Sequence, residues 1–478
     1  MGILRTSSIY AFASIVSQLT SFMILPIYTT ALTISEFGVL SMIETYVFFF
    51  MAISSLAVER AAQRFFYEES IAEKAFDFAL SIIFIWGGLV SVLLWILHSI
   101  LGFNLYQLGG GGVLLFFVVG IGQNIAALAQ VYFQVNQKPL HYLGFVLLKV
   151  ILIFLSVYWF LIHERVGVLG YLYSYAITFF VLSVFSIWSM RNFNIFSSIS
   201  SLDGRLISKK FMQFSLPFVP TILCGWVISM SGRIILDEFS SSENVAIYAL
   251  GFKLSTSFFL VSSALSMALA PILFESLSKK GESCNKTLKM IDLSNVFLSL
   301  CGGGFILFGG DLFSPFFSVS YQESFSIVSL LVFSHYISGY MGLTSNNYLS
   351  FYKKTSTQMI CFLISATLNL LISILLAPIF GVFGVVAASI SSMVILIILH
   401  HMVLVKFSLP RFNYYNLAVG LIVLLIASVF NQLFPNSIWN GGYTDFGVRL
   451  SVLTLLIAIV FYLHRDDIKI LTTTTRAI

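Results

Sequence analysis

Four ionisable side chains lie within long apolar stretches of this sequence: Glu44, Lys149, Arg233 and Lys253. A charged residue at the centre of a membrane helix costs about 2.5–3.5 kcal/mol on insertion scales, so it usually faces a cavity or a partner. Three bases and one acid suit a water-filled cleft that receives an anionic group such as phosphate. The blander interpretation is that the long basic side chains reach the membrane interface, or that the charges pair only for packing.

The elements that must position these charges are fourteen apolar stretches, each near the roughly 20 residues that a membrane helix needs. The chain is 58% hydrophobic and 9% charged, with a mean hydropathy of +0.97, which excludes a soluble domain of 478 residues. We therefore predict an all-α polytopic membrane protein with about 14 transmembrane helices. The expected spans are 7–31, 38–57, 78–100, 112–134, 142–163, 166–189, 212–236, 245–273, 290–311, 324–350, 356–378, 382–405, 414–433 and 447–464.

The positive charges sort by side of the membrane. Of the 25 Lys and Arg residues, 20 fall in segments on the same side as the N-terminus, and only Arg165 and Arg449 fall on the other. Positive residues concentrate in cytoplasmic loops, so this bias predicts that both termini are cytoplasmic. The net charge of +5 is then explained by loops that face anionic lipid, and no nucleic-acid partner is expected.

Several chemistries have no sequence signature here. No segment has the spacing of a phosphate-binding P-loop, so the chain is not expected to hydrolyse ATP. Three of the four cysteines lie in predicted spans and Cys284 lies in a loop, which indicates neither a disulfide nor a metal cluster. The predicted outside loops are too short for an enzyme domain. We therefore expect a protein that is not an enzyme and uses no cofactor or metal.

A pattern recurs in the two parts of the chain. Val166–Gly170 matches Phe380–Gly384 at an offset of 214 residues, and the segment around Glu36 resembles the segment around Glu243. Such matches predict two six-helix halves in parallel orientation, an arrangement typical of alternating-access transporters with a substrate site between the halves. Chance recurrence of glycine turns is the alternative. The expected divisions are an N-lobe at 1–190, a linker at 191–211, a C-lobe at 212–410, and two further helices with a cytoplasmic tail at 411–478.

Specific roles follow for the charged and polar residues. Glu44 is the only acid predicted deep within a span, so it is the candidate for ion coupling, or for a gate that pairs with Lys253 or Arg233 on the outer side. A static ion pair is the alternative. Basic residues at inner helix ends could receive an anionic group at the cytoplasmic side: Arg5, Arg60 and Arg64. Amides within the spans could bind hydroxyl groups of a ligand or simply join helices: Gln18, Gln123, Asn124 and Asn369.

The same landmarks carry a family resemblance. Pro26, the turn Ile34–Gly38, the stretch Leu216–Pro220 and the link Ala377–Gly384 resemble the corresponding parts of Wzx-type O-antigen and polysaccharide flippases. These belong to the multidrug/oligosaccharidyl-lipid/polysaccharide (MOP) exporter superfamily. The resemblance implies two six-helix lobes in a MATE-like V shape, plus two extra C-terminal helices. It also implies translocation of an undecaprenyl-pyrophosphate-linked oligosaccharide from the cytoplasmic to the periplasmic leaflet of a bacterial inner membrane.

Two other functions compete with this one. A MATE-like ion-coupled multidrug exporter would need acidic groups for organic cations, whereas three of the four ionisable residues singled out above are bases. A membrane glycosyltransferase or O-antigen polymerase would need a sizeable outside loop with Arg, Asp or Glu. The expected partners are the lipid-linked oligosaccharide and the bilayer. The sequence leaves open whether a polysaccharide polymerase and a chain-length regulator associate with the chain.

Overall fold

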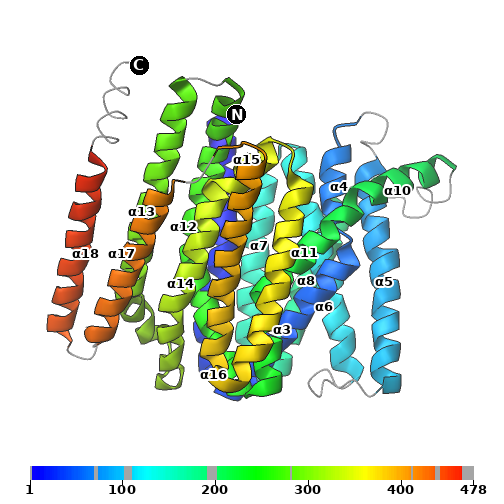
Figure 1. The fold of residues 1–478 in the computed structure, drawn as a ribbon. Helices are drawn as coiled ribbons and strands as arrows, with labels where there is room; N and C mark the ends of the chain where they lie inside the picture. Colours follow the sequence, from blue (N-terminus) through cyan, green and yellow to red (C-terminus); the bar gives the residue numbers. More distant parts are fainter. Residues whose placement is uncertain are drawn as a thin grey trace. The chain divides into compact units, whose positions relative to one another are not determined.

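A computed structural model shows a chain built from helices (Figure 1). The structure describes residues 3–68, 74–101, 110–190, 202–279, 282–410, 413–435 and 442–465, and no strand occurs among them. The α-helices are α1 (Ile3–Met23), α2 (Leu25–Ala31), α3 (Ile34–Ser55), α4 (Val58–Phe65), α5 (Ala75–Leu101), α6 (Gly110–Val135), α7 (Pro139–Val157), α8 (Val168–Ser189), α10 (Leu202–Ser215), α11 (Val219–Phe239), α12 (Ser242–Lys279), α13 (Glu282–Phe313), α14 (Gln322–Leu343), α15 (Ser345–Phe351), α16 (Thr355–Lys406), α17 (Tyr414–Leu433) and α18 (Tyr443–Leu463). A π-helix, Tyr158–His163, extends α7, and short 3₁₀ turns occupy Leu216–Phe218, Ser314–Phe316 and Val319–Tyr321.

The predicted membrane architecture is confirmed. Among the described residues, 13 helical segments are long and apolar enough to cross a membrane. One of them, α16, has 52 residues and contains Gly381 in a non-helical conformation, so it joins two predicted spans across a kink. The chain is therefore a multi-pass helical membrane protein with the expected fourteen crossings.

Local sequence explains where spans break. Between α1 and α2 the helix is interrupted at Ile24, and Pro26 follows in the first turn of α2, where its missing N–H costs nothing. The long tenth span divides at Thr344, whose φ of −117° and ψ of −96° separate α14 from α15. The Thr344 side chain donates to the Tyr340 carbonyl oxygen at 2.6 Å, beside the Thr344 N–H that donates to the same oxygen at 3.1 Å.

The helices group into two compact units. The first covers Met1–Ala246 and the second Ile247–Ile478. In the first unit α6 packs on α8, α1 on α7, and α11 on α3; in the second, α13 packs on α17 and α14 on α16. The boundary between the two units follows Ala246, later in the chain than residue 212, where the C-lobe was predicted to begin. The reason is that α11 packs on α3 and so belongs to the first unit. The last two helices, α17 and α18, both contact α13 and lie side by side (Figure 1).

The recurring glycine motif adopts the same local structure twice. Gly167, before α8, has φ 71° and ψ −145°, and Gly381, in the kink of α16, has φ 54° and ψ −129°. A side chain with a Cβ rarely adopts such angles, so glycine is required at both turns. Three residues later, Gly170 and Gly384 both lie close to backbone carbonyl groups of the preceding helical segment. The sequence repeat is thus a repeat of backbone geometry.

Candidate functional site

The predicted gating acid lies on a helix that is well fixed at its start. The Thr33 side chain accepts from the Glu36 N–H at 3.3 Å, and the Glu36 carboxylate accepts from the Thr33 N–H at 2.8 Å, which is a capping box. From this start α3 runs to Ser55 and buries Ser41, Glu44 and Thr45. Residues three and four apart share one helix face, so Ser41 presents its carbonyl beside the side chains of the other two.

Arg233 of α11 meets this face of α3. Its Nη1 atom lies 3.8 Å from the Glu44 Oε2 atom, 3.3 Å from the Ser41 carbonyl oxygen and 3.4 Å from the Thr45 Oγ1 atom. About two turns earlier on α11, the Trp226 indole donates to the Thr45 carbonyl oxygen at 3.0 Å. Two polar anchors therefore hold α11 to α3, and both belong to the first unit.

Tyrosines from two other helices complete the surroundings of Glu44. Tyr28 of α2 is fully buried, and its hydroxyl lies 3.4 Å from that of Tyr175 on α8. Tyr171, one turn earlier on α8, packs edge-on against Tyr28. All three phenols are near enough to Glu44 to interact with it electrostatically. The Glu44 carboxylate therefore lies near one guanidinium and three phenol groups.

The burial of this ion pair limits what it can do in this conformation. The side chain of Arg233 is 1% exposed and that of Glu44 is 9% exposed. In this conformation neither group is open to a substrate. The geometry therefore fits a contact that closes the structure or holds it together, and the substrate-binding role of Arg233 stays a prediction.

The other predicted partner of Glu44 belongs to the second unit. Lys253 lies on α12, is half-buried, and its carbonyl accepts a hydrogen bond from Thr256 at 2.6 Å. The proposed pairing of Lys253 with Glu44 stays a prediction.

Lys149 lies in the middle of α7 and faces α1. Its Nζ donates to the Ser17 hydroxyl at 2.8 Å, and α1 packs along α7. Among the described residues no carboxylate forms an ion pair with this half-buried ammonium. A hydroxyl partner leaves the positive charge uncompensated, so this position is suited to an anionic ligand group.

Two of the three bases predicted at inner helix ends, Arg60 and Arg64, lie on α4. Arg60 is exposed and stacks over the Phe218 ring at 5.0 Å, and Arg64 forms a largely exposed ion pair with Glu68 at 3.3 Å. Burial raises the pKa of the neighbouring Glu59 carboxyl, an effect that Arg60 partly opposes. The side chain of Arg5 lies outside the described part of the chain. The structure thus brings two of the three bases onto one short helix.

The candidate sugar-binding amides differ in their surroundings. Asn124 is buried and donates to the Ser54 hydroxyl at 2.9 Å, so it joins α6 to α3. Asn369 is 2% exposed and donates to Ser392 at 3.2 Å, joining the two limbs of α16. Both amides serve helix packing in this structure. By contrast, Gln18 is exposed and Gln123 half-buried, so these two stay available to a ligand.

Sequence reasoning missed a second buried ion pair. Arg449, which was expected on the outer side at the start of the last predicted span, is 2% exposed on α18 and pairs with Asp311 of α13 at 2.8 Å. Asp311 is therefore a second buried acid, at the end of its predicted span. The sequence did carry a signal for this pair. Asp311 and Arg449 lie at the outer ends of two predicted spans, where an acid and a base at the same depth can neutralise each other.

The described part of the chain contains no group of His, Cys, Asp and Glu residues that could hold a metal ion. Cys224, Cys301 and Cys361 are free.

The fold is found in known transporters. No protein-family model matches the sequence, and no curated protein matches it. Among solved structures, the lipid II flippase MurJ in an inward closed conformation has a TM-score of 0.72 at 12% identity, over 97% of this chain and 100% of MurJ. An inward-facing multidrug resistance MATE family transporter of the MOP superfamily has a TM-score of 0.65 at 12% identity, over 82% of this chain and 95% of that one. A mutant of the Vibrio cholerae MATE transporter VcmN has a TM-score of 0.58 at 14% identity, over 84% of this chain and 96% of that one. The chain therefore has a MATE/MurJ-like fold.

Proposed function

We propose that this protein is an alternating-access flippase. It moves an undecaprenyl-pyrophosphate-linked oligosaccharide, the repeat unit of O-antigen or another surface polysaccharide, from the cytoplasmic to the periplasmic leaflet of a bacterial inner membrane. Both termini are cytoplasmic in this proposal. The carried lipid-linked sugar is its main partner, with a polysaccharide polymerase and a chain-length regulator as candidates for association.

The observation that carries the proposal is the uncompensated charge of Lys149. A half-buried ammonium whose hydrogen-bond partner is a hydroxyl attracts an anion, and a pyrophosphate is the anionic part of the proposed substrate. An exporter of organic cations gains nothing from such a group, because like charges repel.

The fold supports a lipid-linked substrate over a drug. The match to the lipid II flippase covers 97% of the chain and so includes most of α17 and α18, whereas the MATE match covers 82%. A flippase of lipid II handles a lipid-linked molecule, and we extend that class of substrate to this chain.

The driving force in this proposal is not ATP, because the sequence has no P-loop. We propose that Glu44 and Arg233 separate when α3 and α11 move apart, and that Glu44 then becomes accessible for ion coupling. In the arrangement described here the pair is buried, as a shut gate would require. The static-packing interpretation makes the opposite prediction, since the pair then never opens.

The test uses cells that lack this protein and carry the wild type, Lys149→Met, Lys149→Arg or Lys406→Ala. Lipid-linked oligosaccharide and surface polysaccharide are both quantified. We expect Lys149→Met to accumulate lipid-linked repeat units and to lose surface polysaccharide, and Lys149→Arg to retain function because it keeps the charge. Lys406, exposed at the end of α16, is the matched control and should behave as wild type.

A different pattern would refute the proposal. Normal surface polysaccharide in the absence of the protein, together with increased sensitivity to organic cations, would assign the chain to multidrug export instead. In that case Lys149 would have only a structural role, and both lysine variants at this position would leave polysaccharide unchanged.

A further inference from the structure

The second unit contains a polar pocket that is separate from the residues considered above for transport. It lies between α13, α14, α17 and α18 and has a volume of about 540 Å³, within the range of ordinary ligand sites. Besides Asp311 and Arg449, its polar lining side chains are Ser314, in the turn after α13, and amides and hydroxyls from α14 and α17: Gln322, Ser326, Ser329, Asn431 and Gln432. The charge distribution of the sequence assigns this end of the helices to the outside.

The pocket carries no net charge among its described lining residues. The ionised groups among them are Asp311 and Arg449, which neutralise each other across 2.8 Å. The Arg449 Nη1 atom also donates to the Leu307 carbonyl oxygen at 2.9 Å, so the guanidinium is fixed on α13. Because neither sign of charge is in excess, the wall favours a neutral polar ligand over a phosphate or an organic cation.

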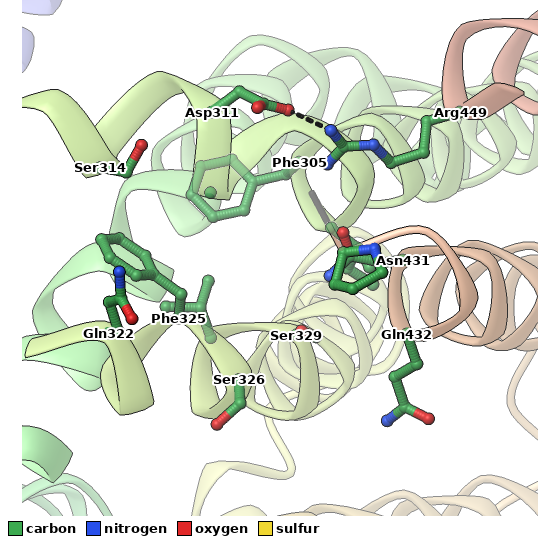
Figure 2. Close-up of a pocket in the computed structure, with 14 residues that line it drawn as sticks. Phe305, Asp311, Ser314, Gln322, Phe325, Ser326, Ser329, Asn431, Gln432 and Arg449 are labelled. Carbon is green, nitrogen blue, oxygen red and sulfur yellow. Dashed lines mark ion pairs between the residues drawn. The ribbon is translucent and has the colours of Figure 1, made fainter. Parts of the chain in front are cut away.

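The remaining lining groups match the two kinds of surface on a sugar ring. Amides and hydroxyls can both donate and accept, which suits the hydroxyl groups around the edge of the ring. Phe305 and Phe325 also line the pocket and are only partly exposed, and a phenyl face packs well against the apolar C–H face of a sugar. Figure 2 shows Phe325 and Gln322 on one side, Asn431 and Gln432 on the other, and the Asp311–Arg449 pair along a third.

The polar groups are accessible to a ligand. Gln322, Ser326 and Gln432 are exposed, and Asn431 is partly exposed. Ser326 donates to the Glu323 carbonyl oxygen at 2.7 Å, which leaves its oxygen able to accept. Because water reaches these amides, a sugar hydroxyl binds by replacing that water, and each exchanged hydrogen bond contributes about 0.5–1.5 kcal/mol net.

We propose that this pocket binds a neutral carbohydrate of one or two sugar rings at the outer side of the membrane. The ion pair holds α18 against α13 and thereby shapes the site, while the amides of α14 and α17 contact the sugar. The proposal does not depend on the transport function proposed above. If both proposals hold, the pocket receives neutral sugars of the translocated oligosaccharide after its pyrophosphate has left Lys149.

The experiment measures direct binding by the full-length protein in phosphatidylcholine nanodiscs. Saturation-transfer difference NMR is recorded with lactose, maltose and N,N′-diacetylchitobiose as probes. We expect transfer to at least one of these sugars, and about a fivefold loss of affinity in Gln432→Ala and in Asn431→Ala, the effect of one lost hydrogen bond. Gln134→Ala removes an exposed amide of the first unit that has no proposed role in binding, and it should leave the affinity unchanged. Because Gln432 is exposed, its variant is not expected to impair folding.

Three results would overturn the proposal. The first is that none of the three sugars shows transfer. The second is that glucose 6-phosphate binds much more tightly than glucose, which would show that the pocket selects anions. The third is that glycerophosphoethanolamine displaces the sugars, which would make the pocket a phospholipid headgroup site. Flux of lipid-linked oligosaccharide in the Gln432→Ala cells separates the two proposals, because loss of sugar binding with normal flux leaves the flippase intact.

Discussion

The ion pair between Glu44 and Arg233 should contribute measurably to the stability of the first unit. At 3.8 Å and an effective dielectric constant of about 20, the attraction between two unit charges is about 4 kcal/mol. Removing one member leaves the other buried without its partner, which typically costs about 3–5 kcal/mol. We therefore expect Glu44→Gln and Arg233→Gln each to lower the free energy of unfolding by about that amount.

A double-mutant cycle isolates the pairwise contribution. The variant that carries both substitutions should lose less than the sum of the single losses, because no isolated charge is left buried. The free energy of unfolding is measured by reversible denaturation with sodium dodecyl sulfate in mixed micelles, followed by circular dichroism. A coupling energy below about 0.5 kcal/mol would refute the reasoning, since that is the size expected of an exposed pair.

The exposed pair Arg64–Glu68 is the matched control. Its side chains are 55% and 38% exposed at a separation of 3.3 Å, so the same cycle should give about 0.3–0.5 kcal/mol. If this pair coupled as strongly as the buried one, burial would not be the reason for the difference.

Transport then separates a gate from a static pair. Glu44→Arg and Arg233→Glu each place two like charges together and should abolish flux of lipid-linked oligosaccharide. If the pair is a gate, the double variant Glu44→Arg/Arg233→Glu again places opposite charges together. The contact can then form and separate as in the wild type, and flux returns. If the swapped variant regains stability without flux, the pair has only a packing role.

Three further predictions follow from single positions. Gly38→Ala would press a Cβ atom into the Ser242 carbonyl group, so the backbone must shift and thermal stability should fall by the equivalent of about 1–3 kcal/mol. Gly381→Ala should lower the free energy of unfolding by about 1–3 kcal/mol, because alanine is strained at a φ of 54°. Gly342 is helical and a Cβ atom there meets open space, so Gly342→Ala should be neutral or stabilising; thermal unfolding of both variants checks this. Asn124→Leu should lower stability without changing which sugars are transported, because its amide joins two helices; a changed sugar preference in flux assays would contradict that role.

The sequence by itself determined the membrane architecture. Apolar runs long enough to cross a bilayer are a local property of the chain, so the fourteen crossings could be counted without any knowledge of contacts. The interruptions of the helices near Pro26 and at Gly381 also depend on local sequence, since these residues restrict the backbone angles of their own segments. The repeated glycine motif likewise predicted a repeated turn, because its requirement comes from the missing Cβ.

Only the tertiary structure decided which side chains meet. Sequence reasoning left Glu44 with two possible partners, and packing of α11 on α3 placed Arg233 beside it. Packing of α18 on α13 likewise buried Arg449 against Asp311, a pair that hydropathy had not indicated. The physical reason is that hydropathy fixes where a helix lies along the chain, whereas its rotation about its own axis depends on how side chains of neighbouring helices interlock. A charge near the end of a span can face lipid headgroups or another helix, and only that rotation distinguishes the two.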